Sequence, residues 1–557
     1  MRGGESATLG GEVLEIRWLG KVAYSDAYVL QHRLFAGSAE HLLLLEHNHV
    51  YTLGVRTDPA HILVDPATVG AEMVSVDRGG DVTYHGPGQL VGYPILDVPL
   101  RSNATPEFVG KVEELVIRAL ARHGITGVRH EGFPGVWTWS ADGRLKKIAA
   151  IGVRISRGRS MHGFALNVSP DLGMFGHIVP CGIAEYEVTS MEAEGSPATM
   201  EEVVASVAEL APEVFDRPTH SFFGVSSSTG YLTEDGSGEI VRAEPAKVTA
   251  AERSLDRRLA SAGVSTAEGI AISSSKPEWV KLRSNMGGEY QELKRTMRGL
   301  SLVTVCEEAG CPNIFECWSQ GTATFMINGE DCTRSCGFCL VKTDKPKPMD
   351  PDEPRRVAAA VEEMGLRFAV ITAVARDDLE DGGISGFVNA ITEIRQRTSG
   401  VSVEVLIPDC KGNEEALSAI YDARPEVLNH NVETVVRLQR AVRPQASYAR
   451  SLRVLAGAVD KGLVAKSGII VGMGETMDEL RATLRDLAAV GVEIVTIGQY
   501  LRPTRKHLPV ARWYTPKEFA ELKAYGEALG IRHVESSPNT RSSYHARQAA
   551  DGLVVLS

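Results

Sequence analysis

The chain has 557 residues, of which 43% are hydrophobic and 23% charged, and its formal net charge is −12. This length exceeds one ordinary hydrophobic core, so we expect two or more domains. The acidic balance is opposite to that of most nucleic-acid-binding proteins and disfavours that class. No apolar run has the length of a membrane span, and residues 1–15 look like neither a signal nor a transit peptide. We therefore expect a cytoplasmic protein with no membrane and no nucleic-acid partner.

A polar stretch joins two regions that differ in their pattern of predicted helices and strands. Residues 226–275 are rich in Ser, Gly, Ala, Thr and Glu, a composition that buries little surface and suits a linker. A short helix with a solvated surface is expected over 250–260. The predicted domains are therefore 1–225 and 276–557.

The first region mixes helices and strands without a strict order. Apolar positions in 107–123 follow a helical period that Gly124 ends. Residues 149–155 and 163–168 are predicted strands on either side of a turn at 157–159. The pattern predicts an α/β or α+β domain.

The second region alternates regularly between strands and helices. The predicted strands are 323–327, 368–373, 401–407, 468–471 and 493–500, and the predicted helices are 355–364, 387–397, 414–422, 447–461, 478–490 and 517–529. Repeated β–α units predict a parallel sheet, closed or partly closed as a barrel. The loops after the strands of such a barrel form its active face.

Six of the eight cysteines fall within 306–339, and clustered thiols in a reducing compartment indicate metal rather than disulfides. Cys332, Cys336 and Cys339, spaced C-x3-C-x2-C, follow the first predicted strand of the barrel. Three thiolates can hold three irons of a [4Fe–4S] cluster and leave the fourth iron open to S-adenosylmethionine. Zinc is the alternative, although structural zinc sites favour paired C-x2-C knuckles and four ligands.

A second trio of thiols precedes the first, at Cys306, Cys311 and Cys317. Its C-x4-C-x5-C spacing is one thiolate short of a closed site, so a further ligand or an open position is implied. A zinc site or a structural thiol group remains open for this trio taken alone. Beside the first trio, we interpret it as a second [4Fe–4S] cluster.

Around these cysteines the second region resembles the lipoyl synthase family over about 276–545. The resemblance is carried by both cysteine runs, Arg376-Asp-Asp-Leu, Gly472-Met-Gly-Glu-Thr and Arg541-Ser-Ser-Tyr. It implies a radical S-adenosylmethionine enzyme with a partial (β/α) barrel, whose auxiliary cluster is completed by Ser543. It also implies insertion of sulfur at carbons 6 and 8 of a protein-bound octanoyl chain, with a reductant such as ferredoxin or flavodoxin. An iron–sulfur redox sensor or scaffold is the alternative from another class.

Other polar residues of this region are weaker candidates. Asp377, Asn429 and Glu433 could hold the ribose or amino-acid end of S-adenosylmethionine, with Arg443 in support; structural ion pairs are the alternative. Cys410 follows a predicted strand and is expected to be a small packed residue.

Two features of the first region carry chemistry. Cys181 lies in Ile178-Val-Pro-Cys-Gly-Ile, where Pro and Gly indicate a turn that leaves the thiol uncrowded. Free cysteines are more often packed than reactive, and a catalytic thiol needs a lowered pKa, which Lys147, His85 or His162 could supply. The Gly-rich run from Arg78 to Gln89 allows close approach of a ligand, but its spacing matches no phosphate-binding fingerprint.

These segments resemble the lipoyl(octanoyl) transferases, which share their fold with lipoate and biotin ligases, over about 14–222. The resemblance implies that Cys181 takes an octanoyl group from acyl-carrier protein as a thioester and that Lys147 lowers the pKa of its thiol. The implied acceptor is a lysine on a lipoyl domain of 2-oxoacid dehydrogenases or on the glycine cleavage H protein. An ATP-dependent ligase and a silent binding module are the alternatives. The implied acyl and lysine channel consists of Arg78, Gly79, Gly80, Asp81, Val82, Thr83, Tyr84, His85, Ala150, Ile151, Gly152, Gly163, Phe164 and Ala165.

Six basic residues lie between Arg144 and Arg159 although the chain is acidic. They form either a solvated hairpin or a docking patch for an acidic carrier protein. Taken whole, the sequence predicts a fusion of two consecutive enzymes of lipoate biosynthesis. Tethering would raise the local concentration of the shared intermediate if the linker lets both sites reach one lysine.

Overall fold

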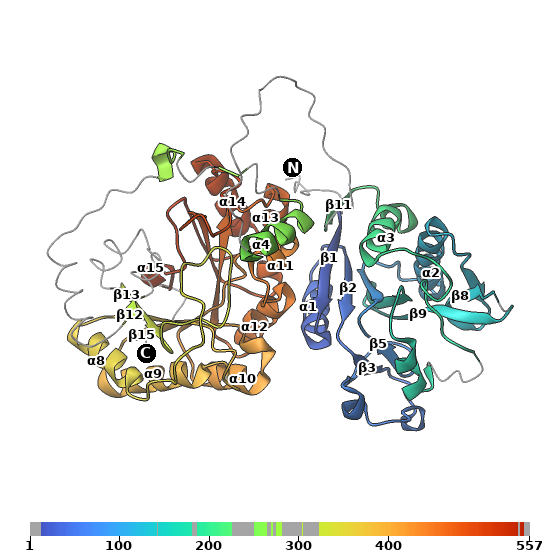
Figure 1. Cartoon of the computed structure of the whole chain (residues 1–557), viewed down its shortest axis with the longest axis horizontal. Coiled ribbons are helices and arrows are strands. Elements are labelled where there is room, and N and C mark those ends of the chain that lie inside the picture. Colours follow the sequence, from blue (N-terminus) through green and yellow to red (C-terminus); the bar gives the residue numbers. More distant parts are fainter. Residues whose placement is uncertain are drawn as a thin grey trace, which may run out of the picture. The chain divides into compact units, whose positions relative to one another are not determined.

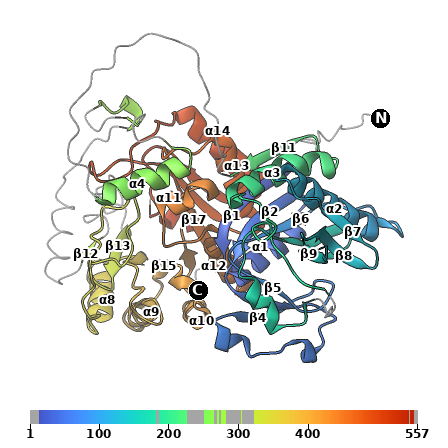
Figure 2. The same cartoon turned by 45° about the vertical axis from the view of Figure 1, so that its right-hand side comes forward.

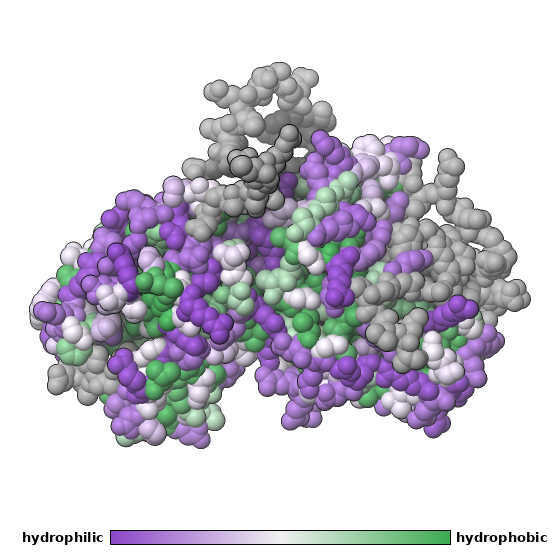
Figure 3. Space-filling model, turned by 180° about the vertical axis from the view of Figure 1, so that it is seen from behind, coloured by the Kyte–Doolittle hydropathy of each residue, from purple (hydrophilic) through white to green (hydrophobic). Residues whose placement is uncertain are grey.

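The computed structural model of the chain describes residues 13–141, 143–180, 186–224, 250–264, 269–270, 274–280, 303–304, 322–543 and 546–550. The chain divides into two compact units, Met1–Val241 and Arg242–Ser557 (Figure 1). Across the described ranges, no helix combines the length and apolar character needed to cross a bilayer. Hydrophilic and hydrophobic side chains are interspersed over the face of each unit drawn in Figure 3.

The first unit is built on a mixed sheet of eight strands in the order β11-β1-β2-β6-β10-β9-β8-β7. β11, β1 and β2 are parallel, and the remaining neighbours are antiparallel. The bounds are β1 Leu14–Val22, β2 His41–His47, β6 Gln89–Ile95, β7 Val128–His130, β8 Phe133–Trp139, β9 Leu145–Ser156, β10 Arg159–Asn167 and β11 His220–Phe223.

Helices α2 (Ala104–Arg122) and α3 (Met200–Val214) pack on this sheet through one continuous apolar core. Helix α1 (Tyr24–Ala36) contacts β6 and β10. A small second sheet joins β4 (Glu72–Ser75), β3 (Val50–Leu53) and β5 (Thr83–His85). The predicted helix and both predicted strands are confirmed as α2, β9 and β10.

The second unit contains a sheet in the order β12 to β19, in which β13 to β19 are parallel and β12 is antiparallel. The bounds are β12 Val303–Thr304, β13 Thr322–Ile327, β14 Phe368–Ala373, β15 Ser402–Leu406, β16 Val427–Asn429, β17 Val464–Val471, β18 Ile494–Gln499 and β19 His533–Ser536. In the described part of the chain, β19 does not pair back to β12, so the barrel is partial.

Helices lie outside this curved sheet (Figure 2). They are α8 Glu353–Glu363, α9 Ile384–Arg397, α10 Glu414–Asp422, α11 Gln439–Val442, α12 Tyr448–Asp460, α13 Met477–Ala489 and α14 Pro516–Ala528. The predicted fold class, an α/β domain followed by a partial (β/α) barrel, is confirmed. The strands that the sequence did not predict include β16 and β19, whose three and four residues are too short to show a pattern.

Inside the barrel, an apolar cluster lies next to a buried ion pair. The short helix α15 (Ala546–Ala550) packs against Phe368, Val370, Val427 and Ile494. Beside this cluster the fully buried Lys466 ammonium lies 2.9 Å from Glu404 Oε1. Asn429 Nδ2 donates to the same oxygen at 2.9 Å. Because both charges are removed from water, each depends on the other for its stability there.

The predicted linker differs from the structure in its second half. Residues Ala250–Ser261 form helix α4, and its Leu259 side chain is fully buried rather than solvated. The Arg437 guanidinium donates to the carbonyl of Ala262, and Ile270 N donates to Val510 O at 2.8 Å. This segment is therefore part of the second unit, because its apolar positions find a partner surface that its composition did not reveal. Residues 226–249, 265–268 and 271–273 of the predicted linker lie outside the described residues.

Candidate functional site

The first unit holds a cavity of about 540 Å³ between β5, β9 and β10, within the range of small-ligand sites. The predicted residues that line it are Arg78, Gly79, Gly80, Asp81, Thr83, His85, Lys147, Ala150, Ile151, Gly152, Gly163, Phe164 and Ala165. Val82 and Tyr84, expected in the same wall, point the other way and pack in an apolar cluster with Tyr51 and Phe175. Alternation along the extended chain separates them from Thr83 and His85.

Lys147 enters this cavity from β9 and is only 8% exposed. Its Nζ lies 5.2 Å from the centroid of the buried Trp137 ring, a cation–π contact. A Cβ on Gly135, in the neighbouring strand, would lie 2.6 Å from Lys147 Cε, so this glycine leaves the space that the lysine stem occupies. Lys146 instead pairs with Glu187 at 3.0 Å. Of the two adjacent lysines, Lys147 is the one in the cavity wall.

Cys181 lies outside the described residues, but the segments that flank it are anchored at the cavity. On its amino side, Val179 N donates to the carbonyl of His61 at 2.8 Å, and the His61 ring pairs with Asp81 of the wall. On its carboxyl side, Thr189 N donates to Lys147 O at 2.9 Å. The chain therefore leaves one wall of the cavity before Cys181 and returns to another wall after it.

A chain of amide hydrogen bonds orients His85. Its Nδ1 donates to Gln89 Oε1 at 2.8 Å, Gln89 Nε2 donates to Asn167 Oδ1 at 2.9 Å, and Asn167 Nδ2 donates to Thr189 O at 2.9 Å. Because an amide oxygen only accepts, this arrangement assigns the proton to Nδ1 and makes Nε2 the acceptor nitrogen. Burial, with the nearby His47 adding to it, lowers the pKa of His85 to about 3. The ring is thus neutral at physiological pH.

Other cavity residues escaped sequence reasoning. Tyr24 and Tyr93 both line the cavity, and Tyr93 Oη donates to His47 Nε2 at 2.7 Å. They occupy apolar-pattern positions, so nothing in the sequence separates them from core residues. His162, noted only as a possible partner of the thiol, lines the cavity with φ +59 and places Nε2 2.8 Å from Asp77 Oδ1.

The basic run of 144–159 is mostly paired within the chain. Arg144 pairs with Glu187, and Arg154 pairs with Asp77. Arg159 lies 2.6 Å from Asp97. The cluster consequently offers less free positive charge than its sequence predicts, and its role as a docking patch stays a prediction.

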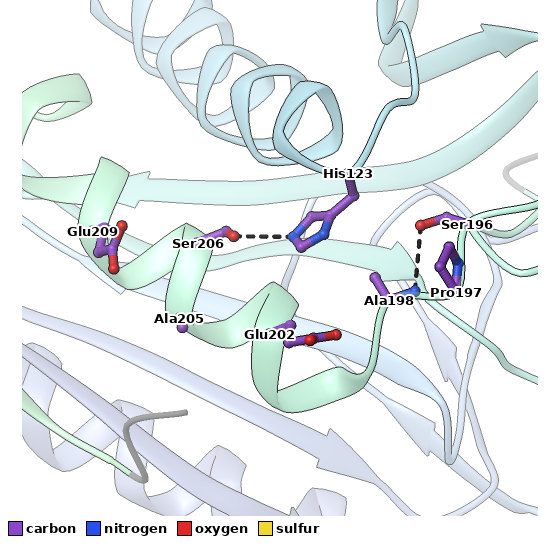
Figure 4. A pocket seen from close by; sticks show the side chains of 8 residues that line it. All are labelled: His123, Ser196, Pro197, Ala198, Glu202, Ala205, Ser206 and Glu209. Carbon is purple, nitrogen blue, oxygen red and sulfur yellow. Dashed lines mark hydrogen bonds between the residues drawn. The ribbon is translucent and has the colours of Figure 1, made fainter. Parts of the chain in front are cut away.

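A second hollow of the first unit, of about 700 Å³, lies between the end of α2 and the start of α3 (Figure 4). Its polar groups bond to one another: His123 Nε2 lies 3.0 Å from Ser206 Oγ, and Ala198 N donates to Ser196 Oγ at 3.4 Å. None of the predicted site residues lines it, and we assign it no chemistry.

In the second unit, the loop of Cys332, Cys336 and Cys339 follows β13 at the carboxyl edge of the parallel sheet, and its thiols are free. Backbone hydrogen bonds hold this thiol loop from several sides. Gly337 N donates to Val442 O at 2.8 Å, and Cys332 N donates to Lys342 O at 2.8 Å. Backbone atoms alone thus tie the loop to the residues around it.

The buried Arg334, between the first two thiols of the loop, clamps it to the sheet. Its Nε and Nη2 donate to the two carboxylate oxygens of Asp377, both at 2.7 Å, and Nη2 also donates to Asp409 Oδ1 at 2.6 Å. Although burial opposes it, the positive charge of Arg334, with His430 and Arg450 in support, lowers the pKa of Asp409 to about 2. Asp377, a candidate for cofactor binding, is therefore engaged in this clamp.

The other residues that were predicted to bind S-adenosylmethionine have different surroundings. Asn429 donates to Glu404 of the buried ion pair inside the barrel. Glu433 has φ +64 and accepts from Asn431 Nδ2 at 3.0 Å, while Arg443 Nη1 donates to the carbonyl of Asn431 at 2.9 Å. Cys410 is buried, as expected.

The thiol loop fits an iron–sulfur cluster. Burial raises the pKa of the Cys336 thiol and raises that of Cys339 to about 12, and bound iron would hold both as thiolates. Within the described ranges, no three His, Cys, Asp or Glu side chains are grouped as ligands of a single metal ion. A [4Fe–4S] cluster places each thiolate on a different iron, so its ligands need not converge on one point.

Cys306, Cys311 and Cys317 lie outside the described residues. Ser543 is half-buried on a segment that runs along the carboxyl edge of the sheet. On this segment Ser542 Oγ accepts from Asn431 Nδ2 at 2.7 Å, and a Cβ on Gly498 would lie 2.0 Å from Thr540 O. Ser543 and the thiol loop therefore share one edge of the barrel.

Comparison with known proteins agrees with this division. Residues 23–210 match the profile of the lipoyl protein ligase A/B catalytic domain, 326–487 that of the radical SAM superfamily, and 267–311 that of the N-terminal domain of lipoyl synthase. A lipoyl synthase of Rubrobacter xylanophilus is 58% identical over 278 residues, which are 50% of this chain and 87% of that protein. One of Mycolicibacterium smegmatis is 54% identical over 271 residues, 49% of this chain and 86% of that protein. A solved lipoate protein ligase of Thermoplasma acidophilum aligns with 16% identity and a TM-score of 0.33 over 38% of this chain and 86% of that one.

The first unit thus matches the lipoyl protein ligase A/B catalytic domain, and the second matches the radical SAM superfamily. Over its carboxyl-terminal half the chain belongs to the lipoyl synthase family. This membership implies S-adenosylmethionine and iron–sulfur chemistry in lipoate biosynthesis.

Proposed function

We propose that the chain is a bifunctional enzyme that transfers an octanoyl group to a lipoyl-domain lysine and then converts that group to lipoyl. The observation that carries the first step is a cavity into which Lys147 projects, bordered on two sides by the segments that flank Cys181. The second step is supported by the thiol loop at the carboxyl edge of a radical SAM barrel.

In the proposed transfer, the Cys181 sulfur attacks the thioester carbonyl of octanoyl-acyl-carrier protein. A new sulfur–carbon bond forms, the bond to the carrier sulfur breaks, and the carrier thiol leaves with the proton that Cys181 gave up. The acceptor lysine then attacks the Cys181 thioester, so an amide forms and the thiol returns. Lys147, held beside Trp137, favours the thiolate of Cys181 by taking its proton and passes that proton to the departing carrier sulfur. In the second half-reaction Lys147 takes a proton from the acceptor amine and returns it to the Cys181 sulfur.

The test of this step uses matched variants. Cys181→Ser and Lys147→Met should each abolish transfer from octanoyl-acyl-carrier protein, whereas Lys146→Met, which removes an ion pair with the exposed Glu187, should leave it nearly unchanged. Mass spectrometry of trapped wild-type enzyme should find one octanoyl group on Cys181. Adenylate formation from octanoate and ATP, with full activity in Cys181→Ser, would instead identify a ligase.

In the second unit, Cys332, Cys336 and Cys339 would hold the cluster that binds S-adenosylmethionine. Cys306, Cys311, Cys317 and Ser543 would hold an auxiliary [4Fe–4S] cluster. Bound together, these groups supply an adenosyl radical that removes hydrogen and a sulfur source for carbons 6 and 8 of the octanoyl chain. The residues of this chain supply the fixed thiol loop, its Arg334 clamp, and a hydroxyl ligand that releases iron more readily than a thiolate would.

The number of clusters is tested by iron and sulfide content. Cys332→Ala with Cys336→Ala should halve the iron content of reconstituted protein, and Ser543→Ala should weaken the second cluster while leaving reductive cleavage of S-adenosylmethionine intact. Ser542→Ala is the matched control, because its hydroxyl already bonds to Asn431. If Ser543→Ala retained both clusters and full sulfur insertion, the serine would not be a ligand.

The proposed partners are acyl-carrier protein, lipoyl domains of 2-oxoacid dehydrogenases and of the glycine cleavage H protein, and a protein reductant, and the proposed compartment is the cytoplasm. The proposed domains are 1–225 and 276–557. Proteolytic cleavage between the units should slow the coupled reaction only at dilute lipoyl domain, where tethering matters. Equal coupled rates before and after cleavage would exclude channelling.

A further inference from the structure

One border of the thiol loop is strongly basic, in contrast to the net charge of −12 for the whole chain. Residues 501–512 contain four basic side chains and no Asp or Glu. Arg505 and Lys506 are exposed and Arg502 is partly exposed. We call these three residues the cationic rim.

The rim is attached directly to the thiol loop. His507, next to Lys506, donates through Nε2 to the carbonyl of Cys339 at 2.9 Å, and Leu508 N donates to Gly337 O at 3.0 Å. A Cβ on Gly337 would lie 2.8 Å from Leu508 Cγ, so the two segments are packed as closely as a glycine allows. The side chain that follows Cys339 is Leu340, an apolar residue that is 42% exposed.

The charges of the rim are not neutralised by acids within the described part of the chain. Arg502 donates only to backbone, to the carbonyls of Thr504 and Arg505. Arg505 and Lys506 have no ion pair among the described residues, unlike nearby Lys342, which lies 2.9 Å from Asp331 and 2.7 Å from Asp344. The rim therefore projects uncompensated positive charge beside an exposed apolar residue.

We propose that the cationic rim, with Leu340 at its edge, docks an acidic one-electron carrier protein, of the flavin or iron–sulfur class, that reduces the thiol-loop cluster. The proposal rests on the proposed function of the second unit and adds the docking site. The reduced carrier loses one electron and the cluster gains it, and the oxidised carrier then leaves. Opposite charge speeds the encounter, and Leu340 offers the apolar contact that a short-lived complex needs beside the cluster.

The test compares two double variants of the full chain with both clusters loaded. Arg505→Glu with Lys506→Glu reverses the rim, and Lys517→Glu with Lys523→Glu makes the same charge change on α14, away from the thiol loop. Reduced flavodoxin is the acidic probe, and dithionite is the small reductant that needs no docking surface. Cluster reduction is followed by stopped-flow absorbance at low and high salt, and flavodoxin binding by calorimetry.

Reversal of the rim should slow reduction by flavodoxin about tenfold or more at low salt, weaken its binding and reduce the salt dependence, while reduction by dithionite is unchanged. The α14 variant should match wild type. Equal flavodoxin rates in the rim variant and wild type would overturn the proposal. So would a raised KM for the lipoyl domain with dithionite as reductant, because the rim would then serve the substrate. Failure of wild type to cleave S-adenosylmethionine with dithionite would refute the proposed function itself.

Discussion

Replacement of Gly135 by alanine provides a direct test of the role of Lys147. The added Cβ would lie 2.6 Å from Lys147 Cε and 2.6 Å from the carbonyl of Ala149. Carbon atoms in contact are normally about 3.5–4.0 Å apart, so the lysine stem must withdraw by about 1 Å. Displacement of a catalytic group by about 1 Å can cost about 100-fold in rate. We expect octanoyl transfer by Gly135→Ala to fall by about two orders of magnitude.

The variant also carries a backbone penalty, because Gly135 has φ +131, which residues with a Cβ rarely adopt. Gly143→Ala controls for the positive φ: Gly143 lies in the same β8–β9 hairpin with φ +76, and its added Cβ meets nothing within 4 Å. Transfer from octanoyl-acyl-carrier protein is assayed in both variants, with urea unfolding of each as the measure of stability. The reasoning is refuted if Gly135→Ala folds and transfers at the rate of Gly143→Ala.

Three further outcomes are expected. Burial lowers the pKa of His47 to about 4 and that of His85 to about 3 from the ordinary 6.5. Between each lowered pKa and pH 6.5, the unfolded state therefore binds more protons than the folded state. The stability of the first unit should therefore be complete above pH 6.5 and fall as the pH drops toward 3–4; urea midpoints across this range would contradict us if they were flat. Lys466→Met leaves the buried Glu404 charge unpaired and should cost about 3–5 kcal/mol of stability, while Lys466→Met with Glu404→Leu should recover most of it in thermal unfolding. Asp409→Asn loosens the clamp on the thiol loop and should speed the loss of iron to a chelator with little change in the circular dichroism spectrum; iron loss at the wild-type rate would exclude that role.

The accuracy with which the sequence predicted each helix or strand depended on the length of its pattern. Helix α10 and strand β14 were predicted to the residue, because α10 has apolar positions at helical spacing and β14 is an almost continuous apolar run. Strand β16, with three residues, left no such trace. Helix α4 was expected to be solvated, since its charges suit a linker, yet two leucines of its sequence are buried.

In the candidate site, the sequence predicted the segments that line the cavity but not which of their side chains face it. The Gly-rich run predicted a ligand wall, but only the extended backbone of 82–85 decides that Thr83 and His85 face the cavity while Val82 and Tyr84 face an apolar cluster. From the sequence, the carboxylate of Asp377 could bind a cofactor or form a structural ion pair. Only the folded structure shows that it pairs with Arg334.

The sequence by itself gave the candidates for chemistry and the fold class: two trios of clustered thiols, a lone cysteine between Pro and Gly, and the alternation that builds a parallel barrel. Spacing along the chain carries this information, because the three thiols of each trio lie close together in the sequence. The tertiary structure alone decided that Val82 and Tyr84 face away from the cavity, that Ser543 shares an edge with the thiol loop, and that a basic rim borders Cys339. These relations join residues far apart in sequence, and they exist only once the strands pair in register.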